Sequence, residues 1–187
     1  RIEDGRETGS RNIEQFAYWD DLLIKNGQLI TKKREGFIDF LNSGTKTILP
    51  LMVHYEPSKI SVERLLQYKD AEVGAGVTLV GPHRDDFHVT ISVANEYKDV
   101  RYFGSRGQQR LVVLQLKLLQ IVFMEQSLGI RPLLLLDDIF SELDSRHINH
   151  ILEEIPTQQA IITTTHEEFI KNIDSKKMNI IRLGTTD

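Results

Sequence analysis

The 187-residue sequence contains no cysteine, which excludes a disulfide scaffold and a thiolate metal site and is compatible with the cytosol. No apolar run approaches the roughly 20 residues that a membrane span needs, and no signal-peptide pattern occurs. We therefore expect a cytoplasmic protein without membrane contacts. Positive charge is not in excess either, since the formal net charge is −4. The chain as a whole is thus not a basic nucleic-acid coat, although local basic patches act independently of net charge.

An initial methionine is also missing. The sequence begins with Arg1, and residues 1–11 are mostly polar and charged, which favours a processed or truncated start. A content of 40% hydrophobic and 27% charged residues predicts a soluble chain with material for one or two domains. No internal repeat or low-complexity segment occurs.

The first 41 residues predict helix from about residue 12. Four apolar residues recur every seven positions, the spacing of one stripe on a helix face: Phe16, Leu23, Ile30 and Phe37. The companion positions are apolar only at the ends: Ile13, Asp20, Gly27, Arg34 and Leu41. The pattern fits one long helix or two with a break near Gly27, packed on a neighbour, or an ordinary bundle helix. Gly44 is expected to end it as a left-handed cap.

The next segment predicts an edge strand over residues 48–55, because Pro50 removes a ladder donor. Ser61 is placed to cap a short helix that ends near Lys69. Composition shifts at residues 74–76, so we expect a helical arm over residues 1–75 and a second domain over residues 76–187.

The second domain alternates strands and helices. Strands are expected at 77–80, 87–93 and 98–103, the last two as a hairpin around Asn95 and Glu96. A helix over residues 111–126 is apolar nearly all round, which predicts burial. The strand at 133–137 lacks alternation, as in sheets covered on both faces. A helix at 146–155, a strand at 159–164, a helical turn at 167–172 and a strand at 178–183 complete a parallel α/β pattern.

Two acids leave the strand at 133–137 together. Asp137 and Asp138 follow four leucines, which is the Walker B pattern. Ligands of parallel sheets bind at the carboxyl ends of the strands. Consecutive strand residues face opposite ways, so one carboxylate could hold Mg²⁺ and the other could polarise an attacking water. A strand that runs into a polar turn is the alternative.

A Gly/Ser-rich turn precedes the long apolar helix. Ser105 can cap the helix, and Gly107 allows a ligand to approach the backbone closely. Unpaired amides and the positive dipole end make a helix N-terminus suitable for phosphate, whereas a plain N-cap is the alternative. Residues 141–144 and 163–166 lie at the same predicted sheet edge, where His166 is either a surface residue or a functional one.

Together these elements resemble the C-terminal half of an ABC-type ATPase head. In that family the turn is the signature motif, which contacts the γ-phosphate of ATP held by the opposite subunit. The resemblance assigns this motif to Gly104, Ser105, Arg106, Gly107 and Gln108, with Arg106 in place of the usual glycine. It makes Asp137 the acid that holds Mg²⁺ through water, and Asp138 the catalytic acid. Most of the family has glutamate there, so the shorter Asp138 implies slow hydrolysis.

The same resemblance assigns two further elements. The D-loop corresponds to Ser141, Glu142, Leu143 and Asp144. The switch histidine of the family directly follows a single threonine. Here Thr164 occupies that slot and His166 lies two residues on, so both are switch candidates.

Three motifs in order resemble the RecF family: GPHRDD at 81–86, GSRGQQR at 104–110 and LLDDIFSELD at 135–144. This implies an α/β fold, the C-terminal lobe of an ABC-type P-loop ATPase head with a helical arm segment. It also implies ATP and Mg²⁺ as cofactors, a homodimer that forms on ATP binding, and binding to double-stranded DNA, single-stranded DNA and their junctions. RecF-type proteins act in DNA repair, replication, recombination and the SOS response, and load RecA at single-strand gaps with RecO and RecR.

One family motif is absent. No G-x-x-x-x-G-K-[ST] sequence occurs, so the chain resembles a C-terminal fragment, which alone should show no measurable ATPase activity. Two alternatives stay open: another SMC-like or ABC-type head in chromosome maintenance, and a non-catalytic interaction lobe. Within residues 81–86, His83 and Arg84 could face phosphate or DNA, or the segment is a structural turn with Arg84 paired to Asp85 or Asp86. Basic residues 32–34 are expected to form a solvated face.

Overall fold

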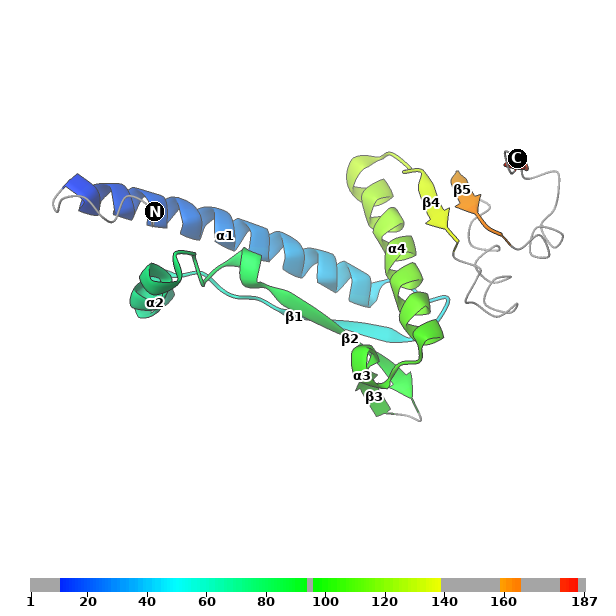
Figure 1. Cartoon of the computed structure of the whole chain (residues 1–187), viewed down its shortest axis with the longest axis horizontal. Coiled ribbons are helices and arrows are strands. Elements are labelled where there is room, and N and C mark those ends of the chain that lie inside the picture. The colour runs from blue at the N-terminus through cyan, green and yellow to red at the C-terminus, as the bar shows by residue number, and fades with distance from the viewer. Residues whose placement is uncertain (1–10, 94–95, 139–158, 166–178, 185–187) are drawn as a thin grey trace. The chain divides into compact units, whose positions relative to one another are not determined.

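The computed structural model describes residues 11–93, 96–138, 159–165 and 179–184 (Figure 1). The chain forms two compact units, the first from residues 1–44 and 51–103, the second from residues 45–50 and 104–187. The boundary expected at residues 75 and 76 does not coincide with this division, because α2 (Val62–Ala75) and the segment after it pack together around Ile60, Leu65 and Val80. That boundary stays a prediction about the domains of the whole protein.

The first unit begins with α1 (Arg11–Ser43), one continuous helix without a break at Gly27. Gly27 is buried because the helix approaches its neighbours closely there. A Cβ added to it would lie 2.6 Å from Cγ2 of Ile60 and 3.3 Å from Cδ of Pro82. Leu41, two turns beyond Arg34 on the same stripe, is also buried. Two of the companion positions, Gly27 and Leu41, therefore pack against the unit.

The predicted apolar stripe faces outward within the described part of the chain. Leu23 is 36% exposed, Ile30 is 43% exposed, and Phe37 is half-buried. The end of α1 also differs from the prediction. Gly44 donates its backbone N–H to the carbonyl of Phe40 at 2.9 Å, but it is not among the residues with a positive φ, so no left-handed cap forms.

A three-stranded antiparallel sheet lies beside α1 in the order β1-β2-β3 (Figure 1). Its strands are β1 (Leu51–Glu56), β2 (Asp86–Val93) and β3 (Glu96–Asp99). The edge position of β1 and the hairpin of β2 and β3 confirm the prediction. Asn42 pairs with one residue on the open edge of β1: its side chain donates to the Val53 carbonyl and accepts from the Val53 N–H, both at 2.8 Å. Val53, Val89 and Ile91 form part of the buried face.

The predicted N-cap of α2 (Val62–Ala75) is confirmed, because Ser61 Oγ accepts from the backbone N–H of Arg64 at 3.3 Å. The helix runs six residues past the expected end and stops at Gly76, which is left-handed with φ 69°. Residues 77–80 are not a strand; instead Val80 is fully buried in the core. A short 3₁₀ turn, η2 (Pro82–Arg84), follows. Residues 100–103 form a helical turn, α3 (Val100–Phe103), where the pattern predicted strand.

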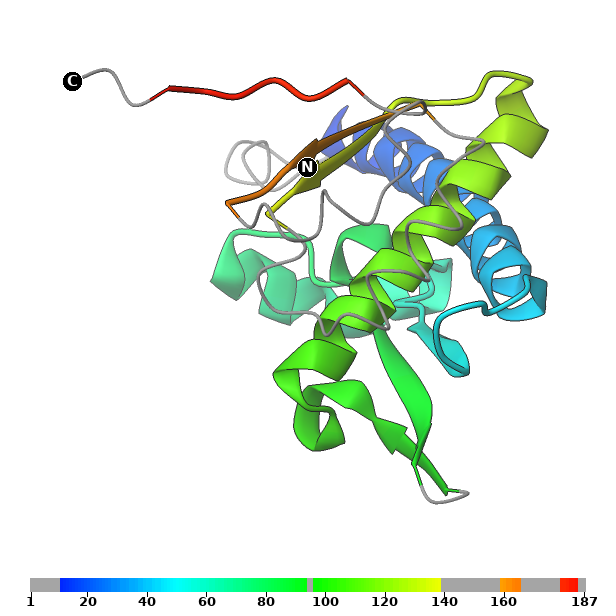
Figure 2. The same ribbon diagram turned by 90° about the vertical axis from the view of Figure 1, so that its right-hand side faces the viewer.

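The second unit contains α4 (Arg106–Leu128), β4 (Leu134–Asp137) and β5 (Ala160–Thr163). The two strands are parallel, with Asp137 opposite Thr163, which confirms the predicted parallel pairing (Figure 2). The connection between them lies outside the described residues. The core joins α4 to β4 through four buried leucines: Leu111, Leu114, Leu134 and Leu136. Ile48 and Leu49 pack against it, and the Ile48 N–H donates to the buried Gln115 Oε1 at 2.8 Å.

The predicted complete burial of α4 and β4 is wrong for the described residues. Val113 and Val122 are 57% and 42% exposed, and Leu135 is 65% exposed although its neighbours Leu134 and Leu136 are buried. Each element therefore buries one side. Among the described helices, α4 is long and apolar enough to cross a membrane, contrary to the sequence expectation, yet its buried side packs on β4 as a core helix does.

The last predicted strand is wrong as far as the structure describes it, because residues 179–184 have no strand conformation. The predicted helix at 146–155 and the helical turn at 167–172 lie outside the described residues.

Candidate nucleotide site and the adjoining turn

The signature turn is built as a complete helix cap. Ser105 Oγ accepts from the Gln108 N–H at 3.2 Å, and Gln108 Oε1 accepts from the Ser105 N–H at 2.9 Å, which is a reciprocal capping box. The Gln109 side chain donates to the Gly104 carbonyl at 3.3 Å. The cap was predicted from sequence, but the part played by Gln108 was not, although Ser followed three residues later by Gln is its sequence signal.

The charges in the first turn of α4 favour an anion nearby. No acidic residue lies in it, whereas Arg106 is exposed at its first position. A cation at the positive end of a helix is unfavourable unless an anion is nearby. Gly107 has no backbone need to be glycine, because its φ is not positive and an added Cβ would meet nothing closer than Ser105 Oγ at 3.9 Å. Glycine here leaves open space beside the cap.

The acids lie at the carboxyl end of β4, as predicted. The Asp137 carboxylate accepts a short hydrogen bond from the Thr163 hydroxyl on β5. The Asp138 N–H donates to both the carbonyl and the hydroxyl of Thr163, each at 3.1 Å. Asp138 then leaves the strand with φ 43°, a left-handed conformation that non-glycine residues seldom adopt. The backbone therefore turns between the two acids.

Thr163 is the residue that sequence reasoning missed. The resemblance singled out Thr164 and His166, whereas it is Thr163 that bonds to Asp137 and Asp138. Apolar runs that end in Asp137 and Thr163 on two predicted parallel strands were the available signal. Thr164 follows β5 directly and is half-buried. His166 and the predicted D-loop at 141–144 lie outside the described residues.

The residues present fit Mg²⁺ held jointly with a nucleotide. Mg²⁺ is commonly bound through one or two carboxylates, substrate phosphates and water. Asp137 offers one exposed carboxylate, and no group of three or more potential ligands occurs in the described part of the chain. An all-protein metal site therefore does not fit these residues.

Both parts of the site belong to the second unit. Leu111 and Leu114 follow the signature turn, and they share one core with Leu134 and Leu136, which precede the acids. The turn and the acid strand thus stand on one packed base.

The turn at residues 81–86 pairs differently from the prediction. Arg34 of α1, and not Arg84, donates to Asp85 Oδ2 at 2.6 Å and to the Pro82 carbonyl at 2.6 Å. Tyr55 donates a short hydrogen bond to the same carboxylate, and the Ser58 N–H donates to Oδ1 at 2.8 Å. Arg34 is therefore not part of a purely solvated face, because it joins the long helix to this turn.

Hydrogen bonds set the charge state of this cluster. Burial alone would raise the pKa of Asp85, but the bonds from Tyr55, Arg34 and Ser58 together hold it below its ordinary value. The bond to Asp85 raises the pKa of Arg34. Burial, followed by the bond to Asp85, raises the pKa of Tyr55.

The sequence has relatives with one shared description, "DNA replication and repair protein RecF". That of Moorella thermoacetica is 40% identical over 159 residues, which cover 79% of this chain and 42% of the relative. That of Agathobacter rectalis is 36% identical and covers 86% and 46%. That of Lachnoclostridium phytofermentans is 36% identical and covers 94% and 51%. The chain spans about half the length of the curated relatives it matches. No protein-family model matches.

The comparison with solved structures also finds RecF. The recombination mediator protein RecF with ATP, described as part of the RecFOR pathway, matches with a TM-score of 0.68 and 28% identity over 88% of this chain and 48% of that one. A second RecF structure with an ATP analogue has the same TM-score.

The fold is α/β, and it is that of the C-terminal lobe of an ABC-type ATPase head with a helical arm segment. Within that class, the chain matches the C-terminal portion of RecF in both sequence and structure.

Proposed function

We propose that this chain is the nucleotide-sensing C-terminal part of an ATP-dependent DNA-binding protein of recombinational repair and replication. Its relatives are described as DNA replication and repair proteins, and a similar structure holds ATP. The observation that carries the proposal is the capped, acid-free turn at Ser105, which shares one core with the strand that ends in Asp137.

In the proposed mechanism the two parts serve two nucleotides. Ser105 and the open backbone at Gly107 contact the γ-phosphate of ATP held by the opposite subunit of a homodimer, and Arg106 adds positive charge beside it. Asp137 and a phosphate-cradling loop outside this sequence serve the nucleotide of the chain's own subunit. ATP binding therefore drives dimerisation.

For hydrolysis, Asp137 would hold Mg²⁺ through water, and Thr163 orients its carboxylate by the hydrogen bond described above. The ion would supply positive charge that neutralises the phosphates. Asp138 accepts a proton from the attacking water, and its short side chain keeps turnover slow. Thr164 and His166 are candidates for sensing the γ-phosphate, and residues 141–144 for the D-loop contact.

The closed dimer binds double-stranded DNA, single-stranded DNA and their junctions, and with RecO and RecR it promotes RecA loading at single-strand gaps. The support is the RecFOR pathway to which a similar protein is assigned. We place this activity in the cytoplasm.

The test is dimerisation of the full-length protein with ATP, measured by light scattering. Ser105→Arg blocks the phosphate contact and should leave the protein monomeric. This change also removes a helix cap, which costs about 0.5–2 kcal/mol. Ser61→Arg is the matched control, because Ser61 caps α2 in the same way. ATP-driven dimers of the Ser105 variant as abundant as those of wild type would sink the proposal.

Hydrolysis is tested by single-turnover ATPase assays of the full-length protein. Asp138→Asn should bind ATP normally but cleave it more slowly, and asparagine tolerates the left-handed backbone at this position. Thr163→Val keeps the side-chain shape but removes the hydroxyl bonded to Asp137, so cleavage should again slow. Thr165→Val, at an exposed neighbour, is the control. Wild-type rates in the Asp138 and Thr163 variants would refute these roles.

A further inference from the structure

The turn at residues 81–86 is held rigidly from its inner side. Gly81 has φ 124°, which only glycine adopts without strain, and its N–H donates to Ser58 Oγ at 3.3 Å. The Arg84 N–H donates to the Gly81 carbonyl at 2.9 Å. Arg34 holds the Pro82 carbonyl from α1. The backbone of the turn is therefore fixed on both flanks.

The first acid of the turn does not reach the surface. The Asp85 side chain is 4% exposed, and its oxygens accept from Arg34, Tyr55 and Ser58. Its negative charge is thus compensated from within. An obvious objection to anion binding at this turn, repulsion by Asp85, is removed by the fold.

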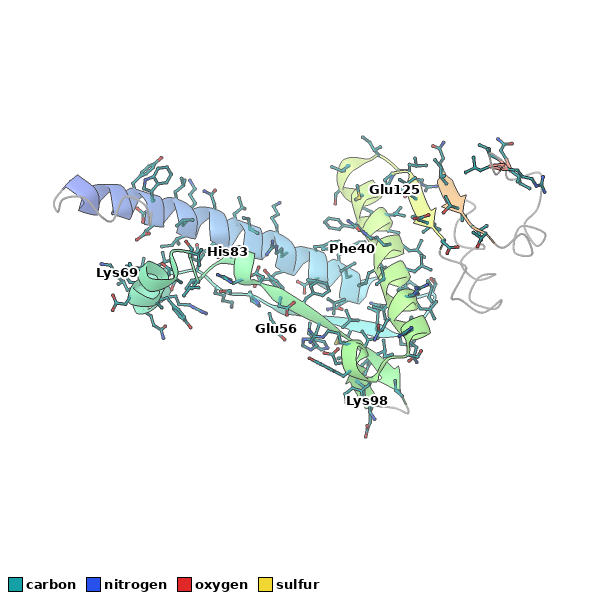
Figure 3. The ribbon with its side chains drawn as sticks, viewed as in Figure 1. Phe40, Glu56, Lys69, His83, Lys98 and Glu125 are labelled. Carbon is teal, nitrogen blue, oxygen red and sulfur yellow. The ribbon has the colours of Figure 1, made fainter. Side chains whose placement is uncertain are left out.

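Two basic side chains remain on the outer side. His83 and Arg84 are both exposed, and both lie against the carbonyl of Thr78, at 2.7 Å from His83 Nε2 and 3.4 Å from Arg84 Nη2 (Figure 3 labels His83). A carbonyl can only accept, so His83 Nε2 carries the hydrogen. No carboxylate among the described residues forms an ion pair with Arg84.

The other acid of the motif is engaged elsewhere. Asp86 begins β2, and its carboxylate lies 4.0 Å from Arg101 of α3 and accepts from the Phe87 N–H at 2.8 Å. Arg84 consequently keeps most of its five donors free, in a position that one weak contact already restricts. Guanidinium groups with free donors in such a fork suit phosphate oxygens.

We propose that the turn at residues 81–86 is a contact for the phosphate backbone of the bound nucleic acid, made by Arg84 with His83 beside it. This rests on the proposed function, and it names a surface for the DNA that the ATP-bound dimer holds. The contact is independent of base sequence because it reads phosphate alone. The same chemistry would suit a nucleotide phosphate, so the test separates the two sources.

The experiment measures binding of a labelled duplex with a single-stranded tail to the ATP-bound full-length protein, at 50 and 200 mM salt. Each phosphate contact contributes about 0.9 to the slope of log affinity against log salt. Losing one contact in Arg84→Gln should therefore weaken binding about 15-fold at 50 mM and about 4-fold at 200 mM, if counterion release supplies the contact energy. His83→Gln should weaken it less.

Arg131→Gln is the matched control, because it removes the same charge from an arginine already paired with Glu125 at 2.8 Å. Equal losses in the Arg131 and Arg84 variants would show a net-charge effect and overturn the contact. An Arg84 variant with the wild-type salt slope would overturn it as well, while leaving the proposed function standing. Absence of DNA binding by the wild type would overturn both.

The phosphate source is settled by titrating the same variants with ATP in place of DNA. Weaker DNA binding with unchanged ATP binding supports the nucleic-acid backbone. Weaker ATP binding with unchanged DNA binding would overturn that assignment and give the phosphate to the nucleotide. Thermal melting of each variant checks that the turn is intact, since the bonds from Arg34 to Asp85 and Pro82 are untouched by these substitutions.

Discussion

The bond between Arg34 and Asp85 should contribute substantially to the stability with which α1 packs on the rest of the first unit. Hydrogen bonds to charged groups contribute about 1.5–3 kcal/mol to stability. The Arg34 side chain is 46% exposed, so solvent screening places Arg34→Gln near the lower end of that range. Asp85→Asn should cost more, about 2–4 kcal/mol, because three donors lose their charged acceptor.

Because the pKa of Asp85 is depressed in the folded state, its contribution is present above the ordinary aspartate pKa of about 3.9 and is lost as pH falls through the folded value. Wild-type stability should therefore drop below about pH 4 more steeply than that of Asp85→Asn. In Arg34→Gln the pKa of Asp85 rises, so the acid-induced loss should be smaller.

Hydrogen exchange of peptides from α1 and β1 is the suitable assay, because two compact units need not unfold in one step. A double-mutant cycle of Arg34→Gln and Asp85→Asn isolates their coupling. Arg84→Gln, on the same turn but with only a 3.4 Å contact to a carbonyl, is the control. If Arg84→Gln destabilises α1 as much as Arg34→Gln, or if Asp85→Asn leaves the acid limb unchanged, the reasoning is refuted.

The remaining predictions concern two glycines of α1 and one buried hydrogen bond. Gly27→Ala should raise helix propensity yet destabilise the first unit by about 1–3 kcal/mol, because its Cβ would lie 2.6 Å from Ile60. Gly36→Ala, with nothing within 4 Å of the added Cβ, should instead stabilise by up to about 1 kcal/mol, and thermal melting of the two variants measures both changes. Gln115→Leu should cost about 1–3 kcal/mol by leaving the Ile48 N–H without its acceptor, and faster exchange of that amide would report it.

Elements with a local cause could be predicted from the sequence. Ser61 and Ser105 cap helices through bonds to residues three positions on, so the signal lies within one turn. The alternation of residues 87–93 likewise fits β2, because side-chain direction in a strand depends only on position. The parallel pairing of β4 and β5 followed from the order of strands and crossovers.

The packing face of α1 could not be predicted from apolar periodicity. That face uses a glycine at close approach and an arginine that binds a carboxylate 51 residues away, and neither contributes to a hydrophobic pattern. The strand predicted over residues 98–103 failed from residue 100 onward for a related reason. Their apolar and aromatic content favours strand, but Asp99 accepts from the Arg101 N–H at 2.8 Å and turns the chain.

The candidate site, too, could be predicted only in part from the sequence. Its residues were recognisable because each belongs to a short motif, but the bond from Thr163 to Asp137 depends on the register between two strands. The register also explains why Asp137 and Asp138 differ in backbone conformation. Asp137 remains in the ladder opposite Thr163, whereas the Asp138 N–H bonds to Thr163 while its backbone turns left-handed.

The signature turn and the acid strand are joined by a short mechanical path. Leu111 lies six residues beyond Ser105, about 9 Å along the helix axis, and it shares a core with Leu136, the residue before Asp137. Close-packed side chains are hardly compressible, so a core of this kind moves as one rigid body. A partner's nucleotide that fixes Ser105 would therefore also fix the strand that carries Asp137. In the proposed dimer, each subunit's acids would then be positioned best when its turn is engaged across the interface, so that hydrolysis follows assembly.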